Sequence, residues 1–180
     1  PHVKVVVVDP RKTNTCDIAD LHLPLNLGTD VWLFNGLLNY LEKNNQLDLD
    51  YINNYTQGFE DSLRAAALSA GDVKATANTL GICENDLATF YKWFGDNEKV
   101  VTLYSQGVNQ SSSGTDKVNG ITNCHLATGR IGKPGMGPFS MTGQPNAMGG
   151  REVGGLANTL ASHMDFTDDN RDRLKRFWNT

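Results

Sequence analysis

Residues 2–8 read HVKVVVV, a valine-rich run that stops at Asp9-Pro10. Short runs of β-branched residues are typical of strands that are buried on both faces of a parallel sheet. Proline ends such a strand because it has no N–H to donate and because it restricts the residue before it. Residues 99–104, which read KVVTLY, have the same character. Two buried strands are therefore expected, one near the start of the chain and one beyond its middle.

Helical patterns separate and follow these strands. From Val31 to Leu41 apolar side chains recur at steps of three and four residues, and Asp30 stands at the N-cap position. Residues 44–55 show no clean period and are expected to form a loop. Helices are expected over residues 30–41, 59–70, 72–80, 85–94, 115–128, 152–162 and 165–175. This order predicts a three-layer, Rossmann-like α/β unit, in which parallel strands share one sheet and are joined by crossover helices, followed by a glycine-rich loop and helix segment.

Glycine content changes along the chain. Twelve of the 18 glycines fall between Gly107 and Gly155. We expect an α/β domain over residues 1–130, and a glycine-rich loop with terminal helices over residues 131–180. The first residue, Pro1, leads straight into a predicted strand, which suggests a piece of a longer protein.

Charge and cysteine content argue against several classes of protein. A net charge of −4 disfavours a nucleic-acid partner, which usually requires a basic field. Three cysteines, Cys16, Cys83 and Cys124, are too few for a four-thiolate iron–sulfur or zinc site. Their wide spacing disfavours a disulfide framework and fits a reducing compartment. No stretch approaches the roughly 20 apolar residues of a membrane helix, so no membrane span is predicted.

Both predicted strands end in polar loops, at residues 9–13 and 105–110. In open α/β sheets, ligands bind beyond the carboxyl ends of strands. Asp9 could accept hydrogen bonds from ribose hydroxyls, and Arg11 and Lys12 could bind phosphate. Alternatively, Asp9-Pro10 only ends the strand and Arg11 is a solvated charge. The G-x-G-x-x-G fingerprint of dinucleotide-binding folds follows neither strand.

Asp30 and Arg151 each have two interpretations. Asp30 is either a helix N-cap or a ligand whose two carboxylate oxygens bind the N1–H and N2–H of a guanine. Arg151 lies within residues 143–154, GQPNAMGGREVG, where many glycines allow the backbone to approach a bound group closely. The alternative is a surface loop with one charge before a helix. The length and glycine content of the stretch favour a site.

Two long stretches of the chain resemble the bacterial molybdopterin oxidoreductase family. They read VVVVDPRKTNTCDIADLHLPLNLGTD over residues 5–30 and LYSQGVNQSSSGTDKVNGITNCHLATGRIGKPGMGPFSMTGQPNAMGGREVGG over residues 103–155. Within the family, the chain is most similar to the catalytic subunits of assimilatory nitrate reductases, and the resemblance covers essentially its whole length. It implies a parent enzyme that reduces nitrate to nitrite by oxygen-atom transfer to molybdenum, which two molybdopterin guanine dinucleotides hold, with an N-terminal [4Fe-4S] cluster for electron transfer.

The resemblance also implies roles for particular residues. Arg151 is implied as the active-site arginine, which would hold nitrate by a forked pair of hydrogen bonds. The residues implied to bind or line the cofactor are Asp9, Pro10, Arg11, Lys12, Thr13, Gly28, Thr29, Asp30, Gln106, Gly107 and Gln110. No metal ligand is implied within the chain, because the cluster cysteines and the molybdenum ligand of the family lie upstream. The family's C-terminal cofactor-binding domain is also missing, so the chain alone is expected to be inactive.

The resemblance implies a cytoplasmic parent, with a periplasmic one still open, and an electron donor that is a protein or an NADH-linked subunit. Two other functions stay open. A formate dehydrogenase, or another molybdopterin oxidoreductase, would be distinguished by its metal ligand upstream. The sequence GQPNAMGGREVG favours a nitrate reductase. A non-catalytic nucleotide-binding module would not need the loop at residues 143–154.

Overall fold

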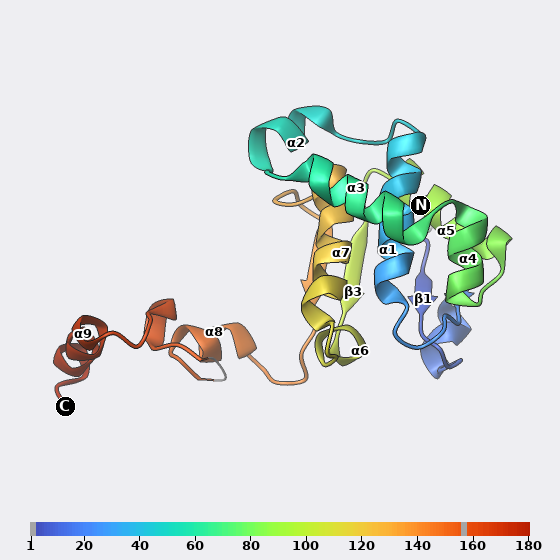
Figure 1. The fold of residues 1–180 in the computed structure, drawn as a ribbon. Coiled ribbons are helices and arrows are strands. Elements are labelled where there is room, and N and C mark those ends of the chain that lie inside the picture. The colour runs from blue at the N-terminus through green and yellow to red at the C-terminus, as the bar shows by residue number, and fades with distance from the viewer. Residues whose placement is uncertain (1–2, 156–157) are drawn as a thin grey trace. The chain divides into compact units, whose positions relative to one another are not determined.

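A computed structural model describes residues 3–155 and 158–180 of the chain. The chain divides into two units, unit 1 over residues 1–140 and unit 2 over residues 141–180 (Figure 1). Unit 1 holds all the strands that the described residues form, whereas unit 2 holds helices and turns.

The strands of unit 1 are short and run parallel in pairs. β1 (Val6–Val8) pairs with β2 (Leu21–Leu23). β3 (Val101–Tyr104) pairs with β4 (Gly137–Ser140), and the connection between them contains a long helix. The predicted α/β class, with parallel strands and crossover helices, is confirmed.

The prediction that the first and second strands share a sheet is wrong. Within the described residues, β1–β2 and β3–β4 form separate two-stranded sheets. Each predicted strand pairs instead with a strand of equal length downstream, which the sequence patterns did not indicate because Pro24 directly follows β2 and Pro138 lies inside β4. The expected start of the first strand at His2 lies outside the described residues, and the observed strand begins at Val6.

Seven α-helices accompany these strands in the described part of unit 1. They are α1 (Asp30–Lys43), α2 (Leu49–Tyr55), α3 (Phe59–Ala70), α4 (Val73–Leu80), α5 (Glu84–Asp96), α6 (Gln106–Asn109) and α7 (Gly114–Ala127), and a 3-10 helix, η1, covers Asn14–Ile18.

Most predicted helices of unit 1 lie within two residues of their expected bounds. Asp72 caps α4 by accepting a hydrogen bond from Ala75 N, and Gly81 ends that helix in the left-handed region. The loop expected over residues 44–55 is confirmed over residues 44–48 and wrong over residues 49–55, because the Asp48 carboxylate accepts from Tyr51 N and so begins α2. α5 also continues past its expected end at residue 94, through Gly95 to Asp96.

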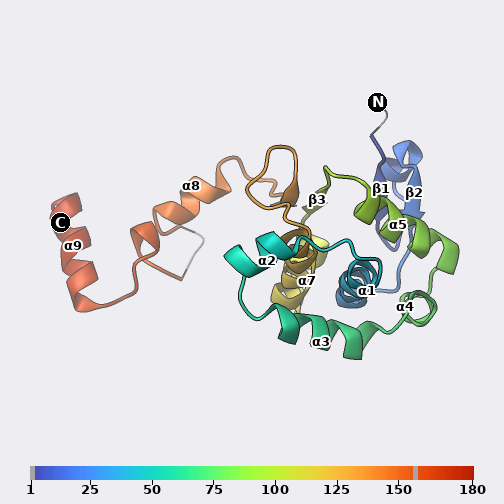
Figure 2. The ribbon, with the colours of Figure 1, turned by 90° about the horizontal axis from the view of Figure 1, so that it is seen from above.

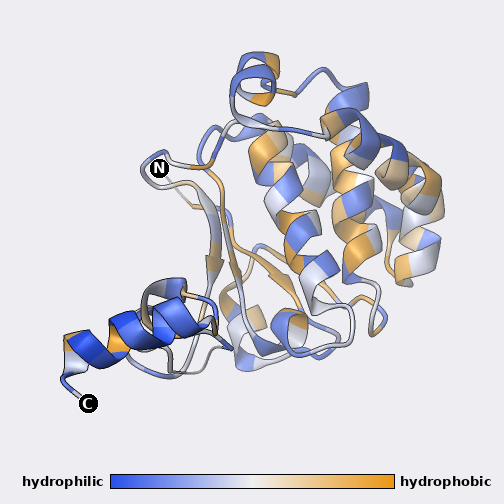
Figure 3. Cartoon of the chain, turned by 60° about the vertical axis from the view of Figure 1, so that its left-hand side comes forward, coloured by the Kyte–Doolittle hydropathy of each residue, from blue (hydrophilic) through white to orange (hydrophobic). Residues whose placement is uncertain are grey.

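Helix α1 carries the centre of the core of unit 1. It packs against α3, α4, α5 and α7, and Figure 2 looks almost along α1 and α7, with β1–β2 and β3 on one side of them and α3 on the other. The apolar period predicted from Val31 to Leu41 is the buried side of α1. Figure 3 shows the resulting apolar stripes on these helices.

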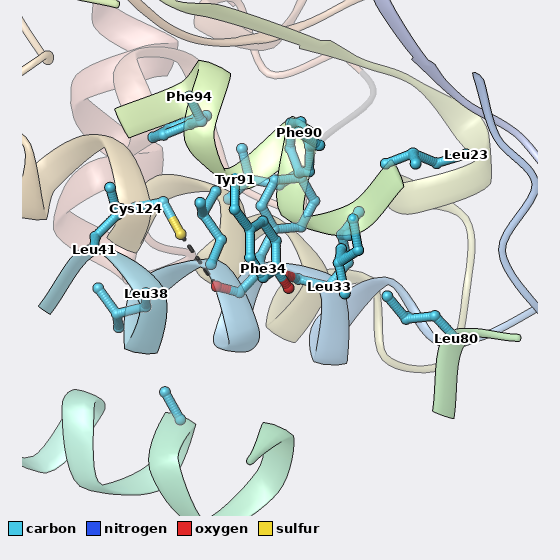
Figure 4. Close-up of a cluster of buried hydrophobic side chains, with 14 of the residues drawn as sticks. Leu23, Leu33, Phe34, Leu38, Leu41, Leu80, Phe90, Tyr91, Phe94 and Cys124 are labelled. Atoms are coloured by element: carbon cyan, nitrogen blue, oxygen red, sulfur yellow. Dashed lines mark hydrogen bonds between the residues drawn. The ribbon is translucent and has the colours of Figure 1, made fainter. Parts of the chain in front are cut away.

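Two polar contacts fix the packing around α1. The Tyr91 hydroxyl of α5 donates to Leu33 O at 2.7 Å, and the Cys124 thiol of α7 donates to Phe34 O at 3.2 Å (Figure 4). Burial raises the pKa of both the Tyr91 hydroxyl and the Cys124 thiol, so both stay protonated as donors. Gly36 leaves room for this arrangement, since a Cβ there would meet the Tyr91 hydroxyl and the Thr76 side chain.

Unit 2 contains α8 (Ala147–Glu152), a 3-10 turn η2 (Ala161–His163) and α9 (Asp168–Trp178). The helix expected over residues 152–162 is wrong in its described part, because the chain turns at Gly154, whose φ is +87°. Residues 156–157 of that prediction lie outside the described residues. The terminal helix is confirmed, and it begins after Thr167, whose hydroxyl accepts from Asn170 N. In the described part of the chain, no helix combines the length and apolar character that a membrane crossing requires.

Candidate functional site

The loop after β1 is built on a turn at Asp9. Asp9 Oδ1 accepts from Arg11 N at 2.7 Å, and the Asp9 carbonyl accepts from His22 Nε2 of β2 at 2.8 Å. These bonds fix the backbone of the loop, while Pro10, Arg11 and Lys12 remain exposed. Asp9-Pro10 therefore does end the strand, and it also presents two exposed basic side chains at that end.

Thr13, the last predicted site residue of this loop, turns away from solvent. It is half-buried, and its hydroxyl lies 3.9 Å from the buried Cys16 Sγ. This contact, together with the Cys16 N–H that donates to Thr13 O at 2.9 Å, ties the end of the loop to η1.

The start of α1 differs from the N-cap interpretation of Asp30. Thr29 is the cap residue, and its hydroxyl donates to Asn26 O at 2.7 Å, whereas Asp30 is the first residue of the helix. The Asp30 carboxylate pairs through Oδ2 with Lys117 Nζ of α7 at 2.8 Å. Gly28 precedes them with a φ of +82°, a conformation that glycine adopts without strain. The carboxylate is thus directed at a cation and not at the helix N–H groups.

The loop after β3 forms a single helical turn, α6, at the same end of unit 1. Gln106 and Gly107 lie in this turn, Gln110 follows it, and all three are exposed. Gly107 is not among the glycines with positive φ, and apart from its chain neighbours and the backbone of its own helix, no described atom lies within 4 Å of the Cβ that another residue would carry there. Unlike Gly36, Gly107 is thus required by nothing in the folding of unit 1 itself.

Lys117 joins two of the predicted site segments. Besides the Asp30 carboxylate, its ammonium group lies 3.4 Å from the Gly107 carbonyl, to which it donates. In Figure 1 the loop after β1, the start of α1 and α6 all lie at the lower end of unit 1. Sequence reasoning missed Lys117, since a lysine within a predicted helix gives no local sign of a partner 87 positions away.

Arg151 lies in the last turn of α8 in unit 2, and it is exposed. No described residue hydrogen-bonds or ion-pairs with its guanidinium group. Glu152, the partner that a purely structural role would use, pairs instead with His163 Nε2 at 2.9 Å. The arginine side chain is therefore available to a ligand as far as the described residues are concerned.

The glycines around Arg151 fall into two groups. A Cβ at Gly149 would meet the Asn146 side chain, which caps α8, so this glycine is required by the local fold. At Gly143 and Gly150, no described atom beyond the neighbouring residues and the local helix backbone lies within 4 Å of the Cβ position, and neither has a positive φ. These two positions leave the backbone open to close approach by another group.

A second polar cluster, at the other end of α7, is structural. Arg130 is buried, donates to Phe94 O at 2.9 Å and Asn97 O at 2.6 Å, and lies 4.7 Å from the centre of the Phe94 ring. His125 is fully buried and bonded through Nε2 to the Thr102 hydroxyl at 2.8 Å. Burial, and next the nearby Arg130 charge, lower the pKa of His125 to about 4. His125 is thus a packed residue of the core.

Comparisons with known proteins agree with the resemblance seen in the sequence. The pattern of the molybdopterin oxidoreductase family matches residues 1–178. A nitrate reductase of Klebsiella oxytoca is 50% identical over 179 residues, which are 99% of this chain and 20% of that protein. The assimilatory nitrate reductase catalytic subunit of Bacillus subtilis is 32% identical, over 96% of this chain and 24% of that protein.

Matches at lower identity include a formate dehydrogenase subunit and one solved structure. The F420-dependent formate dehydrogenase subunit alpha of Methanocaldococcus jannaschii is 30% identical over 98% of this chain and 26% of that protein. The structure of acetylene hydratase from Pelobacter acetylenicus superimposes with a TM-score of 0.66 at 21% identity, over 73% of this chain and 18% of that one, which shows a shared fold. The chain thus spans about a fifth to a quarter of the length of the curated relatives that it matches.

Proposed function

This chain belongs to the molybdopterin oxidoreductase family, and from that premise we propose that it is part of a nitrate reductase. The observation that carries the proposal is the difference in similarity: 50% identity to a nitrate reductase against 30% to a formate dehydrogenase, over nearly the same residues. The parent would reduce nitrate to nitrite with two electrons from its donor. The oxygen atom removed from nitrate would take up two protons and leave as water.

Unit 1 would bind a molybdopterin guanine dinucleotide, and its residues fit such a group. The Asp30 carboxylate, with 18% of its side chain exposed, can accept the N1–H and N2–H of guanine. The exposed Arg11 and Lys12 match phosphate, and the open position at Gly107 permits close approach to the backbone. When bound, the molybdenum of this cofactor supplies the two-electron oxygen-atom transfer.

Arg151 would bind and orient the substrate. A guanidinium presents two parallel N–H donors to two oxygens of a planar anion, which matches nitrate. Its positive charge would also stabilise negative charge that develops on the departing nitrite. The absence of a described partner for Arg151, together with the open positions at Gly143 and Gly150, supports this role.

The remaining parts of the enzyme would come from the rest of the parent. We place there a [4Fe-4S] cluster, the second guanine dinucleotide contacts, and the surface for a protein or NADH-linked electron donor. An assimilatory role, for which the Bacillus subtilis relative is named, favours the cytoplasm. A formate dehydrogenase is the second candidate, because proteins of that name match at 30% identity.

The test is a substitution at Arg151 in the full-length parent, with rates measured for nitrate reduction and formate oxidation. Loss of a forked, charge-assisted contact costs about 2–4 kcal/mol, so Arg151→Ala is expected to slow nitrate turnover roughly 30- to 1000-fold. Arg151→Lys should rescue only part of this loss, because lysine keeps the charge but not the fork.

The matched control is Arg171→Ala, which removes an exposed arginine of unit 2 that pairs with Asp168. It should leave turnover unchanged. Normal kinetics of Arg151→Ala at normal molybdenum content would rule out the substrate role. Formate oxidation without nitrate reduction by the unmodified parent would favour the second candidate.

A further inference from the structure

We propose that Lys117 is a positioning residue, which orients the Asp30 carboxylate so that both of its oxygens face a guanine base. The inference rests on the proposed binding of a guanine dinucleotide by Asp30. Lys117 lies 87 positions after Asp30 in the sequence. A role in holding Asp30 would explain why a lysine is buried at this point of the fold.

The burial of Lys117 is unusual for its residue type. Only 4% of the residue is exposed, and lysine is almost never buried unless it is paired. Its ammonium group has two described partners, Asp30 Oδ2 at 2.8 Å and the Gly107 carbonyl at 3.4 Å. One cation on α7 therefore holds the first residue of α1 and the turn α6 together.

The exposures of the two partners indicate which one a ligand can reach. The Lys117 side chain is 5% exposed, whereas the Asp30 side chain is 18% exposed. An incoming base can thus contact the carboxylate, but the ammonium group is covered. This separates Lys117 from the exposed Arg11 and Lys12, which can meet phosphate directly.

The chemistry of the pair explains how Lys117 acts. A free aspartate side chain rotates about its terminal bond, and each rotation changes the direction of its lone pairs. The ammonium group fixes this rotation by binding Oδ2. The carboxylate has about four acceptor sites on its two oxygens, so sites remain for N1–H and N2–H of guanine. Guanine presents both donors on one edge, whereas hypoxanthine lacks the N2–H.

This difference between the two bases gives the experiment. The full-length parent is produced without cofactor, and its affinities for GDP and IDP are measured by calorimetry. We expect the unmodified protein to prefer GDP. Lys117→Met should weaken GDP binding by about 10- to 100-fold, the range found for residues that orient metal ligands. IDP binding should fall less, so that the GDP-to-IDP ratio moves towards one.

A merely structural lysine would give a different result. Its loss would weaken binding of GDP and IDP by the same factor and leave their ratio unchanged, which would overturn the proposal. Lys117→Arg, which keeps a cation but changes the geometry, should restore part of the ratio. The matched control is Lys92→Met, which removes an exposed lysine of α5 that pairs with Asp96 and should change neither affinity.

A second variant covers the case in which Lys117→Met does not fold because it leaves Asp30 unpaired. In Asp30→Asn/Lys117→Met, neither charge remains, and the double variant should bind GDP no more weakly than Asp30→Asn alone. A further loss in the double variant would show that Lys117 acts independently of Asp30, against the proposal.

Asp30→Asn alone distinguishes the proposed guanine binding by Asp30 from the positioning role of Lys117. Unchanged GDP binding in Asp30→Asn would contradict the guanine-binding role of Asp30, and with it the proposed function of this part of the site. Weaker binding in Asp30→Asn with an unchanged GDP-to-IDP ratio in Lys117→Met would contradict the role of Lys117 alone.

Discussion

Acidification is expected to weaken unit 1 through one buried histidine. His125 is fully buried on α7 and is bonded to Thr102 of β3. Its pKa falls from the ordinary 6.5 to about 4, mainly because burial disfavours the charged ring and also because the Arg130 charge is near. In the unfolded chain the ring is hydrated and regains its ordinary pKa.

The direction and size of the effect follow from this difference. Above pH 6.5 the ring is neutral in both states, and its full contribution to stability is present. Between pH 6.5 and about 4 the unfolded chain binds a proton that the folded chain does not, so the free energy of unfolding falls as pH falls. At 1.36 kcal/mol for each pH unit, the loss amounts to about 3 kcal/mol.

Urea unfolding of the 180-residue chain, followed by tryptophan fluorescence at pH 7.5 and at pH 4.5, measures this loss. Carboxylates also titrate in this range, so the informative quantity is the difference from His125→Gln. The glutamine variant can still hydrogen-bond Thr102 but does not titrate, and it should lose about 2–3 kcal/mol less than the unmodified chain. Equal losses in the two proteins would refute the reasoning.

Three further predictions concern glycine and the separate chain. Gly36→Ala should destabilise unit 1 by about 1–3 kcal/mol in the same urea assay, because its Cβ would meet the Tyr91 hydroxyl and lie 2.9 Å from Thr76 Cγ2. An unchanged midpoint of unfolding would show that the neighbouring side chains move to make room for the methyl group, against this prediction. Gly107→Leu should lower the guanine nucleotide bound per parent molecule at least about tenfold while changing the stability of the cofactor-free protein by less than about 0.5 kcal/mol; full nucleotide content would contradict the open position at Gly107. The 180-residue chain alone should contain no molybdenum and form no nitrite with reduced viologen, and stoichiometric metal or steady turnover would contradict this.

Local sequence signals predicted the helices of unit 1 well. α3 and α4 combine an apolar period with glycine at the end, and α4 adds an aspartate cap, so several neighbouring residues indicate the same bounds. β2 and β4 were missed because strands of three and four residues are too short for a period, and each has a proline beside or inside it. The helix predicted over residues 152–162 failed because Gly154 takes a left-handed conformation.

The candidate site was predictable in part, because local patterns indicate the loops but not the contacts between helices. Polar loops after buried strands gave residues 9–13 and 105–110, and both lie at the end of unit 1 where α1 begins (Figure 1). The role of Asp30 as a helix cap was wrong because its real partner is on α7. An ion pair between Asp30 and Lys117 depends on the packing of two helices, and neither residue carries a local sign of it.

Helix α7 has a mechanical consequence for ligand binding. It contains 14 residues and is therefore about 21 Å long. Lys117 near its start is tied to α1 and α6, while the chain just beyond its end is clamped to α5 by Arg130. Because α7 is held at both ends, it can bend little. The spacing between Asp30 and α6 is therefore set when the protein folds. The guanine base proposed to bind there would therefore meet groups that are already in position, and its binding would not need to order them.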